Sequence, residues 1–284
     1  MLEWIVEHQA GSPVLMKPLS GNSSDAQEFG QVIKDHIAHL QTAYGTTYLV
    51  ADSALYSADN LQKLAETPMK WITRVPAPLG EAQAVLAQAH PQTMVPLREG
   101  YRCRVVPSTY GGVAQRWVLL SSEQRQPQAQ RTVDTQWRKQ SDEEVKAFKR
   151  LCRTAFACEA DAQQALTRFA VSLQTTCLHA STICPTPHYG KRGRPGPGTQ
   201  PDQIVYHITG ALASRLTDRQ ARIDQQSCFI LATNELDEHQ LSTQAVLDGY
   251  KGQARAERGV RFLKDPQFLA SSLYRKKPER VMAL

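Results

Sequence analysis

A chain of 284 residues, 41% hydrophobic and 21% charged, is typical of a folded globular protein with one large domain or two small ones, and not of a disordered chain. No apolar run is long enough to span a bilayer, and the N-terminus lacks the basic start of a signal peptide. We therefore expect a cytoplasmic protein without a membrane partner. Six cysteines without a Cys-x-x-Cys pair indicate reduced, structural thiols.

The formal net charge is +6, and the last part of the chain is strongly basic. Between residues 242 and 284, four acids are opposed by nine basic residues: Lys251, Arg255, Arg258, Arg261, Lys264, Arg275, Lys276, Lys277 and Arg280. This balance favours a polyanionic partner, although a solvated basic helix face is the common alternative.

The first 76 residues alternate between strand and helix patterns. Apolar runs at 4–6 and 14–16 around a Gly-Ser-Pro turn predict a hairpin, and a helix follows over about 25–42, with Asp25 as its cap. Residues 46–51 read as a buried strand, 57–66 as a short helix capped by Ser57, and 69–75 as another strand. This order predicts an α/β fold with a mixed sheet flanked by helices.

The pattern changes after Pro76. Residues 101–106 and 116–121 resemble a hairpin around Gly111-Gly112, and 132–173 resemble an exposed helical arm. A basic linker without acids spans 189–201, strands are expected at 204–209 and 227–233, and a long helix over 242–264 ends before Asp265-Pro266.

Asp52 directly follows the buried strand. Ligands of open α/β sheets bind at the carboxyl ends of strands, so an acid at this position can reach a metal ion. Capping of a turn or of the next helix is an equally good explanation of Asp52.

The long C-terminal helix carries a polar stripe. Tyr250, Glu257 and Lys264 recur every seven residues and share one face with Gln253 and Arg261. Three glycines in the helix, at 249, 252 and 259, each cost roughly 1 kcal/mol relative to Ala, so close approach of another backbone or of DNA would explain them. An ordinary amphipathic helix with ion pairs is the alternative.

These residues resemble those of a large group of bacterial insertion-sequence DDE transposases, whose glutamate helix has the signature Tyr-x-x-Arg-x-x-x-Glu-x-x-x-x-x-x-Lys. The chain matches at Tyr250, Glu257 and Lys264 and departs at Gln253. Two upstream segments agree in order, because residues 20–25 resemble the glycine-asparagine turn of the group and residues 50–56 resemble its second-aspartate strand.

The resemblance implies a ribonuclease-H-like core interrupted by a β-rich plus helical insertion domain. The core would comprise 1–76 and 228–284, and the insertion 77–227. Asp52 and Glu257 would be two of three carboxylates that hold two Mg²⁺ or Mn²⁺ ions for phosphoryl transfer on DNA. Tyr250, Gln253, Arg261 and Lys264 would contact DNA, and the intact enzyme would form a homodimer around the element ends.

The first aspartate of such a site has no match in this chain. The acids before Asp52 are Glu3, Glu7, Asp25, Glu28 and Asp35, and none occupies the expected strand. We therefore expect a fragment truncated at both ends and inactive alone. A non-catalytic DNA-binding or inhibitory remnant is the alternative, and a different nuclease of the same fold is disfavoured by the Tyr-Glu-Lys stripe.

Two further motifs lie in the middle of the chain. Lys191, Arg192 and Arg194 belong to a Lys-Arg-Gly-Arg-Pro segment whose Gly-Arg-Pro core resembles hooks placed in A·T-rich minor grooves, although a flexible basic linker is the stronger interpretation. Cys177, His179, Cys184 and His188 do not have the spacing of a usual zinc finger, and structural roles are favoured for them.

Overall fold

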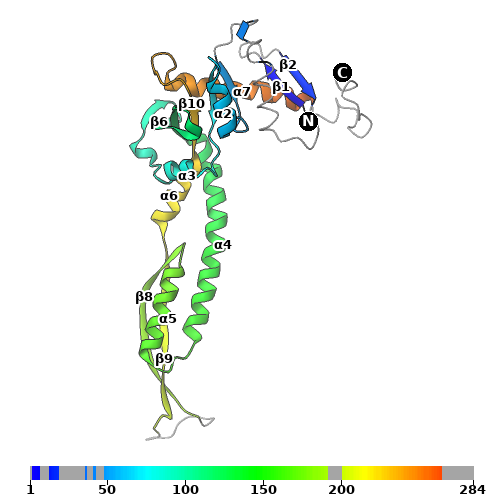
Figure 1. Cartoon of the computed structure of the whole chain (residues 1–284). Coiled ribbons are helices and arrows are strands. Elements are labelled where there is room, and N and C mark those ends of the chain that lie inside the picture. Colours follow the sequence, from blue (N-terminus) through cyan, green and yellow to red (C-terminus); the bar gives the residue numbers. More distant parts are fainter. Residues whose placement is uncertain are drawn as a thin grey trace. The chain divides into compact units, whose positions relative to one another are not determined.

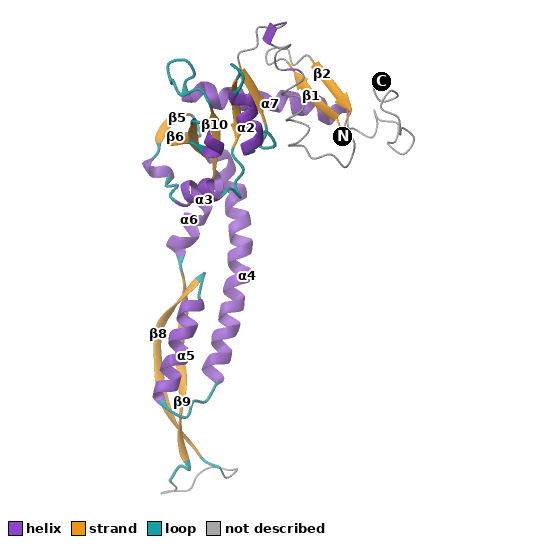
Figure 2. Cartoon of the chain, in the orientation of Figure 1, coloured by secondary structure: helices purple, strands orange, loops and turns teal. Residues whose placement is uncertain are grey.

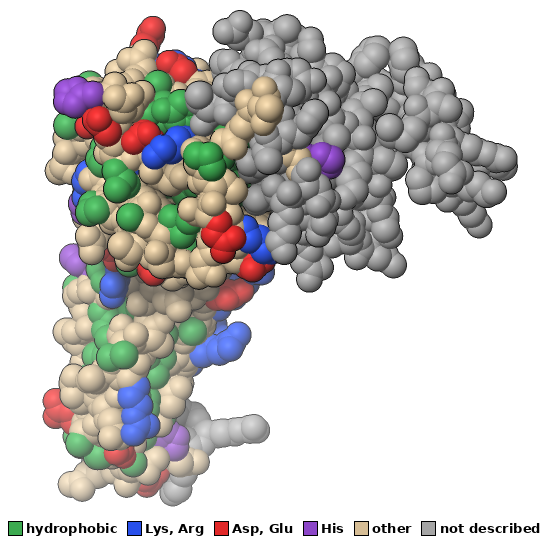
Figure 3. All heavy atoms as spheres, turned by 45° about the horizontal axis from the view of Figure 1, so that its top comes forward, with side chains coloured by type: hydrophobic (Ala, Val, Ile, Leu, Met, Phe, Trp, Pro, Cys, Tyr) green, Lys and Arg blue, Asp and Glu red, His purple; other side chains and the backbone are tan. Residues whose placement is uncertain are grey.

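The computed structural model describes residues 2–6, 13–18, 36, 41–42, 48–190 and 200–263, with side chains described for 36, 41–42, 48–190 and 200–253. The chain divides into two compact units (Figures 1 and 2). The first unit comprises Met1–Glu123 and Cys228–Leu284, and the second comprises Gln124–Ser227. On the face drawn in Figure 3, apolar side chains are interspersed with polar and charged ones.

The first unit contains a six-stranded mixed sheet in the order β3-β4-β10-β7-β6-β5. β3 and β4 run parallel, and every other neighbouring pair is antiparallel. The strands are β3 (Tyr48–Ala51), β4 (Lys70–Arg74), β5 (Val95–Arg98), β6 (Tyr101–Ser108), β7 (Gln115–Ser122) and β10 (Cys228–Thr233). The central strand β10 thus enters the sheet only after the second unit has been completed in sequence.

Helices and short 3₁₀ turns flank this sheet. They are α2 (Ala58–Ala65), α3 (Gly80–Ala87), α7 (Thr243–Leu263), η1 (Pro91–Thr93), η2 (Tyr110–Gly112) and η3 (Glu123–Arg125). As predicted, Ser57 caps α2, because its hydroxyl accepts a hydrogen bond from the Asn60 N–H at 3.3 Å. The expected mixed sheet flanked by helices is confirmed.

The sheet separates two hydrophobic clusters, because neighbouring residues of a strand point to opposite faces. Trp71 belongs to the cluster that contains Leu61 and Leu64 of α2. Ile72 belongs to the cluster that contains Val246 and Leu247 of α7. The α7 helix therefore covers one face of the sheet and α2 covers the other.

The expected N-terminal hairpin is confirmed as β1 (Leu2–Val6) paired antiparallel with β2 (Pro13–Pro18) in a separate two-stranded sheet. The helix expected over about 25–42 falls mostly outside the described residues. No helix among the residues with described structure is long and apolar enough to cross a membrane.

The second unit consists of α4 (Gln126–Arg153), α5 (Glu159–Ser172), a long ribbon of β8 (Thr176–His188) and β9 (Gln203–Ser214), and α6 (Leu216–Ser227). Its core includes Phe148 of α4, Leu166 of α5 and Ile208 of β9. The ribbon has a bulge between His179 and Thr182, opposite Gly210, whose φ is +150°.

A buried carboxylate ties α4 to the start of the ribbon. Glu144 accepts hydrogen bonds from the Thr176 hydroxyl at 2.6 Å, from the Gln174 N–H at 2.8 Å and from the Thr175 hydroxyl at 2.9 Å. Burial opposes the charged form, but these hydrogen bonds outweigh it and lower the pKa of Glu144 to about 2.

The compact units differ from the domain boundary expected at Ala77. Strands β5, β6 and β7 pair into the same sheet as β3, β4 and β10, so the first unit continues to Glu123. The hairpin around Gly111-Gly112 was expected as a local structure, but its pairing with β10 joins residues more than a hundred positions apart. Sequence spacing alone carries no signal for such a contact.

Candidate active site

Asp52 lies in the turn that follows β3, with an exposed side chain. One carboxylate oxygen, Oδ1, accepts a hydrogen bond from the Ala54 N–H at 2.9 Å, and the other accepts none from the described residues. No described Lys or Arg forms an ion pair with Asp52. The turn is thus the local structure that the capping interpretation expected, and it leaves one carboxylate oxygen available.

The backbone around Asp52 is held by its neighbours. The hydroxyl of buried Thr73, on the adjacent strand β4, donates a hydrogen bond to the Asp52 carbonyl at 2.5 Å. After the turn, fully buried Leu55 and buried Tyr56 anchor the chain in the core. The Tyr56 hydroxyl donates to Gln115 and accepts from Trp117, and burial raises the pKa of Tyr56.

Helix α7 lies close to the sheet because it has no side chain at Gly249. A Cβ at this position would lie 3.2 Å from Cδ1 of Ile72 and 3.9 Å from Cγ2 of Val50. Contacts at 3.2 Å are tighter than ordinary van der Waals contact. For Gly249, the close approach expected from the sequence is therefore to the sheet.

The start of α7 is fixed beside β7, three strands away from β3. Buried Arg116, which pairs with Thr233 in the β7–β10 ladder, donates a hydrogen bond to the Leu241 carbonyl just before the helix. The Ser242 hydroxyl accepts from the Ala245 N–H at 3.1 Å, as an N-cap does.

Farther along the helix, Lys251 lies over the ring of Tyr101, with Nζ 4.3 Å from the ring centroid. Tyr101 begins β6 and pairs with Ser122. Burial alone would raise the pKa of Tyr101, but Lys251 and Arg98 outweigh it, and the pKa is lowered.

Strand pairing places Arg116, Ile72 and Val50 in one row across the sheet. Helix α7 meets this row at Arg116 just before its start and again at Gly249, so it crosses the strands from β7 toward β3, the strand that Asp52 follows.

Arg74 lies on the α7 side of the sheet, and no sequence pattern singled it out as a site residue. Ile72 of β4 contacts α7, so Arg74, two positions later on the same strand, follows on the same face. Its strand is the neighbour of β3, which Asp52 follows. The Arg74 guanidinium lies 5.7 Å from the centroid of the Phe229 ring and forms no ion pair among the described residues. The sequence does show that residues 70, 72 and 74 of the strand share one face. Which face of the sheet this is became clear only from the position of α7.

The structure describes the side chains of only some of the other residues expected to contact DNA or metal. Tyr250 and Gln253 are half-buried on α7, and Tyr250 packs against the α7-side cluster. Glu257 and Arg261 lie within α7, with side chains outside the described set, and Glu257 is eight residues beyond Gly249, a rise of about 12 Å. Lys264, Lys191, Arg192 and Arg194 lie outside the described residues.

Asp52 fits a divalent metal ion, because an exposed carboxylate oxygen at the end of a strand is the hard ligand that Mg²⁺ prefers. Among the residues with described side chains, no three His, Cys, Asp or Glu gather into a metal site, and Glu257 is not one of these residues. Cys177, His179, Cys184 and His188 lie along β8 and, within the described side chains, do not form such a metal site.

Comparison with known proteins identifies one family. A family model described as "Transposase DDE domain" matches residues 4–284, nearly the whole chain. No curated protein and no solved structure matches the chain.

Proposed function

The chain belongs to the transposase DDE-domain family, and from that premise we propose that Asp52 and Glu257 supply two of the carboxylates that hold divalent metal ions for phosphoryl transfer on DNA. The substrate would be the ends of an insertion sequence, and the products those of strand cleavage and strand transfer. The observation that carries the proposal is that α7, the helix with Glu257, crosses the sheet toward β3, the strand that Asp52 directly follows.

The roles of the neighbouring residues follow from charge and position. When bound, two divalent ions activate the attacking oxygen and stabilise the leaving oxygen in an in-line displacement. Arg74 from β4 and the α7 stripe of Tyr250, Gln253 and Arg261, continued by Lys264, would hold DNA phosphates against that site. Contacts of this kind fix the register of the DNA and carry little base information.

A second candidate function is a non-catalytic DNA-binding remnant that pairs with intact transposase. The observation in its favour concerns Glu3, the one acid before Asp52 within the described residues: it is on β1, which pairs only with β2 among the described strands. A homodimer that brings two element ends together fits the catalytic proposal, whereas a mixed dimer with a full-length transposase fits the remnant.

Metal binding tests the catalytic proposal directly. We expect Mn²⁺ titration of the full chain with duplex DNA, followed by electron paramagnetic resonance, to show binding that weakens at least about tenfold in Asp52→Asn and in Glu257→Gln. Asp59→Asn is the matched control, because Asp59 is an exposed acid on α2 that pairs with Lys63. Mn²⁺ affinity that is the same in all four proteins would overturn the assignment.

A further inference from the structure

The exposed side of α4 carries a long basic face. Seven Lys or Arg side chains on this helix are exposed, and on a helix that turns about 100° per residue they fall within an arc of roughly 120°. These residues, called here the α4 basic face, are Arg131, Arg138, Lys139, Lys146, Lys149, Arg150 and Arg153.

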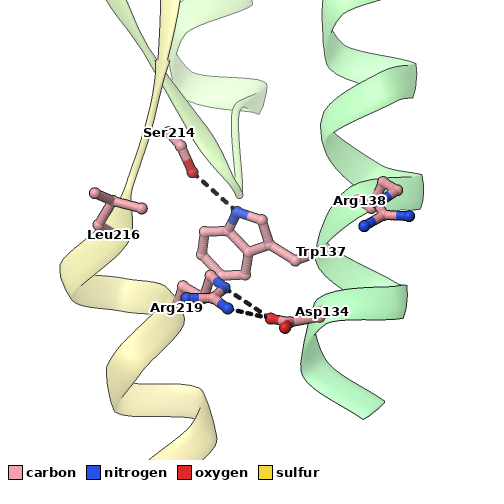
Figure 4. A pocket seen from close by; sticks show the side chains of 6 residues that line it. All are labelled: Asp134, Trp137, Arg138, Ser214, Leu216 and Arg219. Carbon is pink, nitrogen blue, oxygen red and sulfur yellow. Dashed lines mark hydrogen bonds and ion pairs between the residues drawn. The ribbon is translucent and has the colours of Figure 1, made fainter. Parts of the chain in front are cut away.

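The opposite side of α4 is buried, which fixes the orientation of the helix within its unit. Ala129, Val133, Trp137, Glu144 and Phe148 are its buried residues. Figure 4 shows Trp137 and Asp134 pointing away from the axis of α4: the indole N–H donates to Ser214 at the end of β9, at 3.2 Å, and Asp134 pairs with Arg219 of α6. The shallow cavity beside them is also lined by Arg138 of the α4 basic face, and we assign no separate ligand to it.

The charges of the α4 basic face have no partners among the described side chains. None of the seven forms an ion pair there, and the acids exposed along the same stretch are Asp142 and Glu143. The third exposed-side acid of α4, Asp134, is turned to Arg219. A face this rich in one sign of charge leaves a net attraction for anions.

The imbalance is a property of the whole second unit. Residues 124–227 contain fifteen Lys or Arg against nine Asp or Glu, whereas the rest of the chain has eighteen of each. The net charge of +6 therefore belongs to the second unit as a whole, and its helix α4 contributes the largest exposed share. The basic C-terminal region is balanced by acids elsewhere in the first unit.

We propose that the α4 basic face binds the phosphate backbone of duplex DNA through residues other than those of the proposed metal site. From Arg131 to Arg153 the helix rises about 33 Å, close to one turn of B-DNA, roughly 34 Å. Duplex DNA is chosen as the partner because the chain belongs to a DNA-acting family, so this inference rests on the proposed function.

Salt dependence of binding tests the proposal with the full chain and random-sequence duplex DNA. Each phosphate neutralised contributes roughly 0.9 to the log–log slope of affinity against salt. Replacing Lys139, Lys146 and Lys149 together by Gln should lower the slope by about 2 to 3 units. Gln is a good helix former, so the circular dichroism of α4 should be unchanged.

Two control variants show whether the effect on the slope comes from the charge of these residues and from their position on α4. The same three residues replaced by Arg keep the charge and should keep the slope of the parent. Arg168→Gln removes one exposed charge from α5 of the same unit and should change the slope less than Lys146→Gln does.

The outcomes distinguish this inference from the proposed function. An unchanged slope in the triple Gln variant, or equal effects of Arg168→Gln and Lys146→Gln, overturns the α4 basic face alone. Displacement of the duplex by poly-glutamate at equal charge concentration overturns it as well, because the face would then be a general anion binder. Absence of salt-dependent DNA binding by the parent overturns both proposals.

Discussion

The hydroxyl of Thr73 donates a hydrogen bond to the backbone carbonyl of Asp52, so β4 holds the residue that follows β3. Thr73 is fully buried, and the Leu55 N–H also donates to this carbonyl, at 3.4 Å. The proposed metal ligand is therefore exposed at its carboxylate and fixed at its backbone.

Thr73→Val should lower the free energy of unfolding of the first unit by about 1 kcal/mol, because the carbonyl of Asp52 loses its close donor. Urea denaturation followed by tryptophan fluorescence reports on this unit through buried Trp71 and Trp117. Thr73→Ser keeps the hydroxyl and should lose less. If the Val variant is as stable as the parent, the hydrogen bond does not hold the turn.

Gly249→Val should separate α7 from the sheet and lower the stability of the first unit by about 1 to 3 kcal/mol, because the new side chain meets Ile72. Ile72→Ala removes the obstacle, so the double variant should be more stable than the sum of the two single effects by at least about 0.5 kcal/mol. Strictly additive effects would show that the two residues are not in contact.

Glu144→Gln should destabilise the second unit by about 2 kcal/mol at neutral pH, since a charged acceptor of several hydrogen bonds is lost. The folded pKa of Glu144, about 2, is below the usual value near 4.3. The stabilisation is therefore present above about pH 5 and is lost as the pH falls toward 2.

Urea denaturation by circular dichroism at several pH values measures this difference. The gap between the parent and Glu144→Gln should narrow steadily below about pH 4. Glu143→Gln is the matched control, because its exposed neighbouring carboxylate has no hydrogen-bond partner among the described residues. A gap that stays constant with pH would mean that the charge of Glu144 contributes nothing.

The 284-residue chain alone should not cleave DNA in Mg²⁺ or Mn²⁺, because Asp52 and Glu257 supply two of the three carboxylates that the proposed two-metal site needs. Nicking of a supercoiled plasmid provides a sensitive measurement. Nicking that disappears in Asp52→Asn would refute this expectation.

Local patterns in the sequence predicted the elements with strong local signals. The seven-residue spacing of Tyr250 and Glu257 predicted the helix now described as α7, and Ser57 predicted the start of α2. The position of Asp52 at the end of a strand was predicted in the same way, because a strand and its following turn are adjacent in the chain.

Elements with weak local signals were missed. β8 contains Pro185 and Pro187, which argue against a central strand, but a two-stranded ribbon has open edges where proline is tolerated. Helix α6 buries little apolar surface, with Ile223 as its main buried apolar residue, so its periodicity is faint. The role of Arg74 was missed because it depends on a contact between β4 and α7, which lie far apart in sequence.

The place of β10 at the centre of the sheet makes the order of synthesis matter for folding. Until residues 228–233 emerge from the ribosome, β4 and β7 each present an unpaired edge, and the two halves of the sheet have no strand to join them. Exposed edges of this kind template pairing with other chains. The nascent first unit must therefore wait through the synthesis of the entire second unit, and this interval is when the protein is most exposed to aggregation.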